Sequence, residues 1–380
     1  MDKKKQKEHA ITILGGGNIG TLLAADIARD GVHSVRILTS RPYDWSNQIE
    51  VVTRTGEVKF TSRVEHITDD PKKIIPESDI IISTLPSHVF PEYLKKIEHF
   101  IKPGTWLGFM PGSGGGEFYS KELISQGCKL FGFQRVHGIA RIKKYGSSVY
   151  DLGRKNMLYL SSIPTDCGPD IVSFFSKLLK IRCTLLPNYL NVTLTPSNPI
   201  LHTSRIYTLF RTFRDDEYWA NNVEFYSDWS NDASEILFSC DEELQQLCRA
   251  LPELDLTRVK SLKEHYESDT PEKLTKKLRS IEAFKNIKAP MVQLPDGYRP
   301  DLESRYFLED FPYGLCIIKG FCEITGVPTP AIDIVLKWYE RITGTEYYNE
   351  DRFDGNDLQY LPIPMNFGLK DKADIYRFYK

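Results

Sequence analysis

The stretch "AITILGGGNIGTLLAADIARDG", residues 10–31, decides the fold of the first part of this 380-residue chain. A short apolar run leads into "GGGNIG", residues 15–20, and apolar residues then recur at helical spacing. The turn fits G-x-G-x-x-G, whose glycines permit a tight turn, an approach to a pyrophosphate and close helix–strand packing. Free N–H groups at a helix start also favour phosphate. We predict an α/β Rossmann domain with a parallel sheet, in which the dinucleotide contacts Gly15, Gly17, Asn18, Ile19 and Gly20.

The expected second strand, residues 35–38, is followed by Thr39-Ser40-Arg41-Pro42. A site that prefers NAD usually has an acidic residue here, which binds the ribose 2′-hydroxyl. This chain has two hydroxyls and an arginine instead, a set that suits a 2′-phosphate. We therefore predict NADP(H) as the preferred cofactor and NAD(H) as the alternative. The competing interpretation is that Arg41 is only a solvated loop residue.

Two further strands, residues 79–86 and 105–112, flank a predicted helix over residues 90–100. Ligands of α/β sheets bind at the carboxyl ends of strands, so we expect Thr84, Leu85 and Pro86 to border the ribose and nicotinamide. The stretch "PGSGGGEF", residues 111–118, is either a second anion site or only a tight turn.

The pattern predicts four regions: a disordered start (1–9), a dinucleotide-binding domain (10–190), a helical domain (191–345) and an aromatic-rich tail (346–380). Strands at 129–136, 147–153 and 155–163 and a helix at 170–180 complete the first domain. Beyond residue 198 the periodicity becomes helical. The helices expected there cover 198–214, 217–228, 231–250, 257–266, 271–283, 312–325 and 329–343.

Composition narrows the class of protein. The formal net charge is −2, so neither nucleic acid nor an anionic membrane is an expected partner. The seven cysteines are scattered without zinc-site spacing, and we expect reduced thiols and a cytoplasmic protein. No metal site is expected, and the protein is predicted to be a monomer or homodimer.

Two polar groups interrupt the apolar helix predicted after residue 198. Asn198 and His202 are four residues apart and so share one face. Near the end of the helical half, "DLESRYFLEDFPYGL", residues 301–315, contains Arg305 and Asp310. An aspartate bonded to an imidazole fixes its tautomer and yields an acid/base group, and an arginine can bind a carboxylate. The alternatives are a capping asparagine, a core histidine and a surface ion pair.

Other polar and aromatic residues leave two interpretations open. His137 is either structural or a substrate contact, and Arg205 either holds an anionic substrate or has no such role. Tyr226, Asp228 and Trp229 line an amino-acid pocket or simply pack.

Over residues 10–345 the sequence resembles the opine dehydrogenases of the octopine/nopaline type. The matching motifs are "GGGNIG", the N-x-x-x-H of residues 198–202, "RYFLEDFPYGL" (305–315), "TGVPTP" (325–330) and the stretch 140–155. The resemblance implies a Rossmann domain followed by an all-α, 6-phosphogluconate-dehydrogenase-like domain. It also implies an oxidoreductase acting on CH–NH groups, which reduces the imine of an amino acid and a 2-oxo acid with NAD(P)H.

By the same resemblance, His202 is the catalytic acid/base, Asp310 its partner, Arg305 a substrate-carboxylate group and Asn198 an orienting residue. Two other interpretations remain: a ketopantoate-reductase-like enzyme acting on a 2-oxo or hydroxy acid, and a non-enzymatic NADP(H)-binding redox sensor. Ketopantoate reductases resemble this layout but rely on a lysine. The tail after Gly344 has no secure counterpart in the family, and we expect a strap over the helical domain, with a cleft or dimer contact as the alternative.

Overall fold

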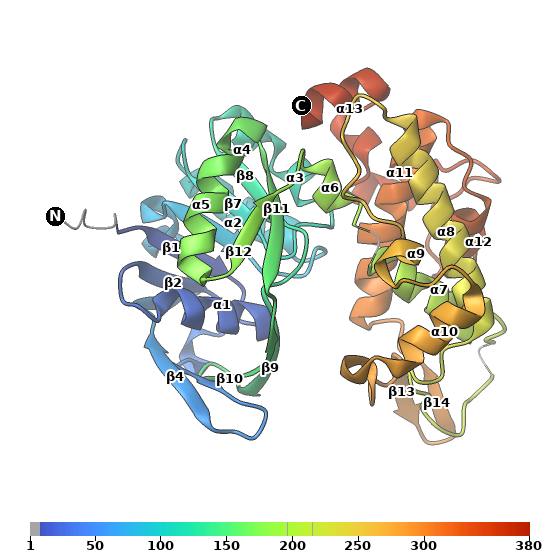
Figure 1. Cartoon of the computed structure of the whole chain (residues 1–380), viewed down its shortest axis with the longest axis horizontal. Helices are drawn as coiled ribbons and strands as arrows, with labels where there is room; N and C mark the ends of the chain where they lie inside the picture. The colour runs from blue at the N-terminus through green and yellow to red at the C-terminus, as the bar shows by residue number, and fades with distance from the viewer. Residues whose placement is uncertain (1–7, 196, 215) are drawn as a thin grey trace. The chain divides into compact units, whose positions relative to one another are not determined.

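The computed structural model describes residues 8–195, 197–214 and 216–380, and it divides into two compact units (Figure 1). The first unit runs to Thr193 and also includes Tyr379 and Lys380, while the second spans Leu194–Phe378. Most of the predicted tail therefore belongs to the helical unit. Residues 1–7 of the predicted disordered start lie outside the described residues.

The first unit is built on an eight-stranded sheet in the order β12-β11-β8-β7-β6-β1-β2-β5. All neighbouring strands run parallel except β11, which pairs with β8 in the antiparallel sense. The Rossmann prediction is thus confirmed, with one antiparallel pair added. The strands are β1 Ala10–Leu14, β2 Ser34–Leu38, β5 His66–Thr68, β6 Ile80–Ser83, β7 Trp106–Phe109, β8 Lys129–Phe133, β11 Met157–Ile163 and β12 Arg182–Leu185.

Short and long helices connect these strands. The α-helices are α1 Asn18–Ala28, α2 Phe90–Ile97, α3 Gly116–Tyr119, α4 Lys121–Ser125, α5 Gly168–Leu179 and α6 Leu190–Thr193. The 3-10 turns are η1 Pro42–Asp44, η2 Pro71–Lys73, η3 Ile75–Glu77, η4 Glu98–Phe100 and η5 Thr165–Cys167.

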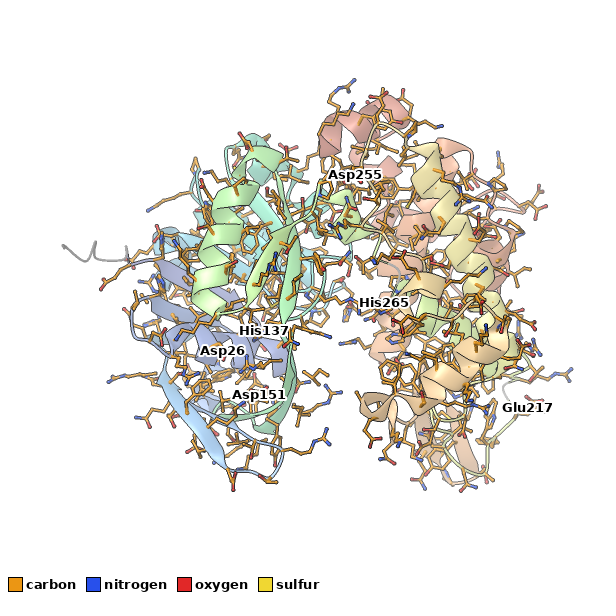
Figure 2. The ribbon with its side chains drawn as sticks, in the orientation of Figure 1. Asp26, His137, Asp151, Glu217, Asp255 and His265 are labelled. Carbon is orange, nitrogen blue, oxygen red and sulfur yellow. The ribbon has the colours of Figure 1, made fainter. Side chains whose placement is uncertain are left out.

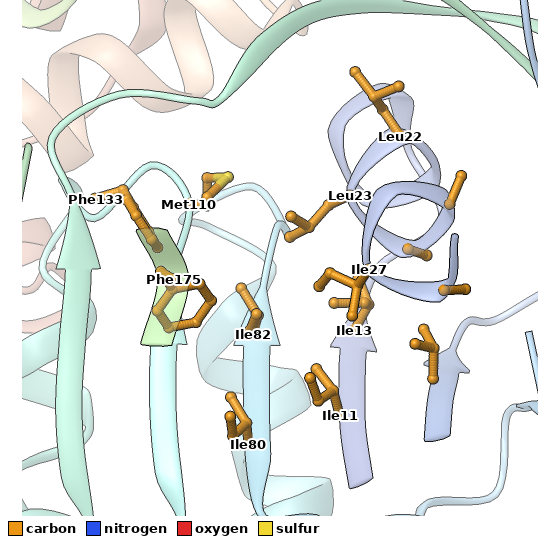
Figure 3. Packing of buried hydrophobic residues seen from close by; sticks show 14 of the residues in the cluster. Ile11, Ile13, Leu22, Leu23, Ile27, Ile80, Ile82, Met110, Phe133 and Phe175 are labelled. Carbon is orange, nitrogen blue, oxygen red and sulfur yellow. The ribbon is translucent and has the colours of Figure 1, made fainter. Parts of the chain in front are cut away.

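The core of this unit forms where α1 covers the centre of the sheet. Figure 3 shows Ile11 and Ile13 of β1 beside Ile80 and Ile82 of β6, with Leu23 and Ile27 of α1 close by; all six are buried. The third glycine of the turn makes this packing geometry possible. A Cβ on Gly20 would lie 2.1 Å from the backbone oxygen of Gly15, so any side chain there would push α1 away from β1.

A second, four-stranded sheet in the order β4-β3-β10-β9 was largely missed by the sequence analysis. Only β10 corresponds to a predicted strand. The bounds are β3 Gln48–Val52, β4 Val58–Arg63, β9 Gly138–Lys144 and β10 Ser148–Arg154. β10 joins β3 in parallel although almost a hundred residues separate them, a pairing that no local pattern announces.

The second unit is mainly helical. Its α-helices are α7 Pro199–Phe210, α8 Asn231–Ala250, α9 Leu262–His265, α10 Pro271–Ser280, α11 Cys316–Thr325, α12 Pro330–Thr343 and α13 Lys372–Tyr379. The π-helix is η7 Tyr306–Leu315, and the 3-10 turns are η6 Glu282–Phe284, η8 Asn356–Tyr360 and η9 Pro364–Phe367. A hairpin of β13 Met291–Leu294 and β14 Gly297–Pro300 qualifies the all-α prediction. The helix predicted over 217–228 was wrong, because turns and isolated bridges occupy that segment.

No helix among the described residues combines the length and the apolarity that crossing a membrane needs.

The tail packs against the helical unit by burying its aromatic and aliphatic side chains. The ring of Tyr347 stacks on that of Tyr339 in α12, with centroids 5.8 Å apart. The Glu340 carboxylate accepts hydrogen bonds from the backbone N–H groups of Tyr347 and Tyr348. A Cβ on Gly320 in α11 would lie 2.8 Å from Pro364. These contacts agree with the expected strap over the helical domain.

A buried carboxylate fixes the start of α12. Glu243 of α8 accepts hydrogen bonds from the N–H groups of Ala331 (2.7 Å) and Ile332 (3.0 Å), two donors that lack partners inside their own helix. Glu243→Ala is expected to lower the free energy of unfolding by about 2–3 kcal/mol, because both donors lose a charged acceptor. Urea denaturation measures this. The matched control is Glu242→Ala, an exposed neighbour paired with Arg249, which should change stability by less than about 0.5 kcal/mol. Equal losses in the two variants would contradict the capping role.

Candidate active site

His202 and Asp310 meet in the interior of the second unit. The Nδ1 atom of His202, on α7, lies 2.7 Å from Oδ2 of Asp310, on η7, and both side chains are 8% exposed. The two residues are 108 positions apart in sequence. An imidazole whose Nδ1–H donates to a carboxylate is held in one tautomer, with its Nε2 lone pair directed at the opposite side. The structure therefore brings together the pair that the family resemblance implied.

The unusual geometry of η7 places Asp310. Residues 306–315 form a π-helix that contains Pro312, which has no N–H to donate to a regular helical ladder. Close to its end, Gly314 packs against the start of α7, where a Cβ would lie 2.8 Å from Pro199. The absence of a side chain at Gly314 lets the two helices approach closely enough for Asp310 to reach His202.

Tyr226 forms a hydrogen bond with the second nitrogen of the His202 imidazole. Its hydroxyl lies 3.0 Å from Nε2 of His202, and burial raises the pKa of Tyr226 well above its usual value. The phenol is therefore protonated and donates to Nε2, which makes an Asp310–His202–Tyr226 chain of hydrogen bonds. The rings of Tyr306 and Phe225 pack on the imidazole at centroid distances of 4.8 and 5.7 Å. From the sequence, Tyr226 could either line a pocket or pack, since a lone tyrosine in a loop carries no distinguishing pattern.

Arg205 lies one turn beyond His202 but is turned to the protein interior. Its Nε donates to the carbonyl of Phe225 (3.0 Å), and a terminal nitrogen donates to that of Asp228 (2.8 Å). Burial lowers the pKa of Arg205 to about 10. These bonds use the guanidinium to hold the loop that carries Tyr226. The predicted contact with an anionic substrate gains no support from this geometry.

Arg305 and Asn198, by contrast, are exposed. Arg305 immediately precedes η7, and its positive charge acts on Tyr226, so it lies within electrostatic reach of the hydrogen-bond chain. Within the described ranges, no hydrogen bond or ion pair neutralises its guanidinium. Asn198 precedes α7, but its side chain makes no capping hydrogen bond. The capping alternative for Asn198 thus has no geometric support, and both side chains are accessible to a ligand.

The glycine-rich turn of the first unit fits a dinucleotide. Gly15 has a φ of +99°, which favours glycine, and a Cβ on Gly17 would meet no atom within 4 Å. The eleven-residue α1 begins without a side-chain cap, so no side chain competes with a phosphate for its N–H groups. Ile19 packs against the core. The Asn18 amide oxygen accepts from the backbone N–H of Ile142 (2.8 Å), which ties the turn to β9 and uses this side chain for structure.

The carboxyl end of β6 borders this turn. Thr84 donates to the carbonyl of Leu14 (3.1 Å), and a Cβ on Gly15 would lie 2.9 Å from the side chain of Leu85. Pro86 follows at the exposed edge. The structure therefore places Thr84 and Leu85 beside the glycine-rich turn, at the sheet edge where α/β folds bind nucleotides.

A tyrosine that the sequence analysis missed lies beside the residues after β2. The guanidinium of Arg41 stacks 3.9 Å above the ring of Tyr145, and the Tyr145 hydroxyl lies 3.2 Å from the Thr39 hydroxyl. Tyr145 comes from the turn between β9 and β10, so its place depends on the unpredicted second sheet. Thr39 is buried, whereas Ser40 and Arg41 are exposed. Arg41 also lies 3.7 Å from Asp44, an exposed pair that a phosphate could outcompete.

His137 is fully buried within an ionic cluster of the first unit (Figure 2). Its Nε2 lies 2.9 Å from Asp26 of α1, whose carboxylate also pairs with Arg154. Arg154 and Lys59 both bond Asp151, and although burial opposes them, they hold the pKa of Asp151 below its usual value. The cluster joins α1 to the second sheet. This position supports the structural alternative for His137 and gives the substrate-contact alternative no support.

The stretch "PGSGGGEF" folds into a turn that contains a buried acid. Glu117, in the four-residue helix α3, accepts hydrogen bonds from the hydroxyls of Thr193 and Tyr379 and is fully buried. These bonds tie the turn to other parts of the same unit, so the tight-turn alternative is the better supported one. No group of three or more histidine, cysteine, aspartate or glutamate side chains suited to a metal ion occurs in the described part of the chain.

Comparison with known proteins finds matches for both units of the chain. Residues 185–343 match the family model of the NAD/NADP octopine/nopaline dehydrogenase alpha-helical domain, and residues 10–112 match that of the NAD-dependent glycerol-3-phosphate dehydrogenase N-terminus. Tauropine dehydrogenase of Arabella iricolor is 26% identical over 94% of this chain and 98% of its own length. Opine dehydrogenase of Haliotis discus hannai is 28% identical over 96% and 97%, respectively.

A solved structure of octopine dehydrogenase with NADH and L-arginine superimposes with a TM-score of 0.85 at 23% identity, covering 97% of this chain and 98% of that one. At this identity the superposition shows a shared fold. Both family models belong to nicotinamide-dependent oxidoreductases, and the sequence matches extend over nearly the whole chain. The helical unit of this chain thus matches the octopine/nopaline dehydrogenase domain, and the chain is similar over nearly its whole length to opine, octopine and tauropine dehydrogenases.

Proposed function

We propose that this protein is an NAD(P)H-dependent opine dehydrogenase, which joins the amine of an amino acid to the keto carbon of a 2-oxo acid and reduces the resulting imine to a secondary amine. The observation that carries the proposal is the buried His202–Asp310 pair, with a 2.7 Å contact, in a chain that also has a dinucleotide turn. By its chemistry the reaction is an oxidation–reduction at a CH–NH group.

The proposed roles follow from the chemistry of each side chain. His202 takes a proton from the incoming ammonium, which frees the nitrogen lone pair to attack the keto carbon. It then returns this proton to the former carbonyl oxygen, and a second proton from the same nitrogen follows to that oxygen, which leaves as water while the protonated imine forms. Asp310 holds the tautomer and stabilises the imidazolium while His202 carries the proton.

The exposed residues near this pair bind and orient the substrates. The Arg305 guanidinium binds a substrate carboxylate through paired hydrogen bonds, and Asn198, with its accessible amide, orients the substrate. The nicotinamide, when bound, supplies the hydride that reduces the imine carbon.

We further propose a preference for NADP(H) over NAD(H). No acidic residue stands at the end of β2, and Arg41, stacked on Tyr145, offers a charged donor set for a 2′-phosphate. Arg41→Ala is therefore expected to lower kcat/KM for NADPH by about 10-fold to 100-fold, the value of one charged hydrogen-bonded contact, and to leave that for NADH nearly unchanged.

Initial rates with both cofactors at saturating substrates measure this preference. The matched control is Arg249→Ala, which removes another exposed arginine, paired with Glu242. Equal losses for NADPH and NADH in Arg41→Ala would show that Arg41 does not read the 2′-phosphate.

A crossed substrate panel tests the proposed function. NADPH oxidation is followed with a set of amino acids, each combined with pyruvate, glyoxylate or 2-oxoglutarate, and NADH is run in parallel. Turnover that requires both an amine and an oxo acid supports the proposal and identifies the pair. Turnover with an oxo acid alone would point instead to a reductase of the ketopantoate type. Cofactor binding without turnover in any combination would favour a redox sensor.

A further inference from the structure

Tyr226 has no role in the reaction as described so far, yet it holds the nitrogen that should exchange protons with the substrate. In the neutral imidazole, Nδ1 carries the proton donated to Asp310, and Nε2 has one in-plane lone pair. The Tyr226 hydroxyl lies on that lone pair at 3.0 Å. While this bond exists, no substrate atom can bond to Nε2 directly.

The surroundings of Tyr226 keep its ring in place. The ring lies against Phe284, with centroids 4.0 Å apart and planes 16° apart, and near the ring of Trp229, with planes 7° apart. Tyr226 is 5% exposed. The bonds from Arg205 to the carbonyls of Phe225 and Asp228 fix the backbone on both sides of it. A substrate would have to break a packed aromatic stack to displace the hydroxyl.

A hydroxyl that stays in place can still pass protons. It donates through its hydrogen to Nε2 and has lone pairs free to accept from another donor. We propose that Tyr226 is the substrate-facing end of an Asp310–His202–Tyr226 proton relay, through which His202 exchanges protons with the reacting amine and oxygen. This inference rests on the proposed function.

The relay balances without forming a free tyrosinate. As an N–H bond of the substrate ammonium breaks, its proton bonds to the Tyr226 oxygen, while the original hydroxyl proton moves to Nε2 of His202. The products of this step are a neutral amine, a neutral tyrosine and an imidazolium paired with Asp310. The reverse movement delivers the proton to the oxygen that leaves as water.

Several other groups face this chain and set its electrostatics. Arg305 and Asp310 contribute opposite charges at Tyr226, and the phenols of Tyr306 and Tyr266 also act on it. The hydrogen bond from Tyr226 stabilises the neutral imidazole specifically, because only a neutral Nε2 can accept it. Weakening or strengthening this bond should therefore move the acid limb of the pH profile in opposite directions.

Two replacements of Tyr226 in the full-length enzyme test the relay. Tyr226→Phe removes the hydroxyl and is expected to lower kcat on the order of 10²-fold. The acid limb of kcat/KM for the amino acid should move to higher pH by roughly half to one unit, the equivalent of one net hydrogen bond. Replacement of Tyr226 by 3-fluorotyrosine keeps the shape and the hydroxyl but makes it a stronger donor. This replacement should move the same limb to lower pH.

The matched control is Tyr339→Phe, which also removes one buried tyrosine hydroxyl, the one that donates to the carbonyl of Phe307 (3.2 Å). In Tyr339→Phe, the acid limb of the kcat/KM pH profile should stay at the wild-type position. The relay is overturned if Tyr226→Phe retains at least half of the wild-type kcat, or if both replacements leave the acid limb unmoved. Should Tyr226→Phe fail to fold, the shift with 3-fluorotyrosine decides alone. If the wild-type enzyme turned over no substrate pair, that result would contradict the proposed function itself and not the relay alone.

Discussion

His202→Asn is expected to lower kcat for reductive condensation by about 10²-fold to 10⁴-fold, the usual contribution of a positioned acid/base group. Asparagine keeps a polar side chain on α7 but cannot carry a proton between the ammonium and the departing oxygen. Cofactor affinity should not change, because the dinucleotide turn belongs to residues 15–20 of the first unit. Steady-state rates and NADPH titration of the same preparation measure the two quantities.

Replacing Asp310, the partner of the imidazole, tests whether the two residues act together. Asp310→Asn replaces the acceptor of the Nδ1–H with a group that no longer stabilises an imidazolium, so it should also lose activity. Since the two residues act as one unit, the double variant should lose little more than His202→Asn alone. The control is His265→Asn, which changes an exposed histidine on α9 and should keep the wild-type rate. Independent, multiplicative losses at the two positions would contradict a functional pair.

The second large effect is a pH dependence of stability set by Glu117. Burial raises the pKa of this carboxyl from 4.5 to about 7, although the hydroxyls of Thr193 and Tyr379 partly offset the shift. The folded protein therefore keeps a proton that the unfolded chain releases between these two values. The stability contribution of Glu117 is fully present below the lower pKa and is lost as pH rises to about 7, by on the order of 3 kcal/mol.

Glu117→Gln should remove this dependence. A glutamine carbonyl can accept the same two hydroxyl donors, but it has no charge to bury. Relative to wild type, the variant should gain stability as pH rises through this window and stay level above it. Urea denaturation at a series of pH values measures the difference, with Glu122→Gln on the exposed face of α4 as the control. A difference between Glu117→Gln and wild type that does not vary with pH would show that Glu117 is not protonated in the folded protein.

The local patterns of the sequence account for much of the fold. The glycine-rich turn, the helix after it and the apolar strands of the main sheet each have a short-range signature, and the structure confirms the Rossmann prediction. The second sheet lacks one, because β3 pairs with β10 from almost a hundred residues away. The wrong helix over 217–228 has a similar cause. The aromatic residues Phe225 and Tyr226 in that stretch contact His202 from a loop and do not belong to a helix. Arg205 holds this loop by donating to the backbone carbonyl of Phe225.

The candidate site shows the same limit. His202 could be singled out because an imidazole on an apolar helix is unusual, and the motif of the family pointed to Asp310. Spacing alone could not bring them together, since the contact depends on the π-helix η7 and on the bare backbone of Gly314. Tyr226 and Tyr145 lie in loops whose positions are set by distant elements, so no sequence pattern could assign them to either site.

The formation of a carbon–nitrogen bond between the two substrates is the central claim. It is tested most directly with NADPH deuterated at the transferred position, incubated with the enzyme and the active substrate pair, and with products identified by mass spectrometry. We expect a secondary amine that contains the carbon skeletons of both substrates and one deuterium on the former keto carbon. A deuterated 2-hydroxy acid, with the amino acid recovered unchanged, would contradict it.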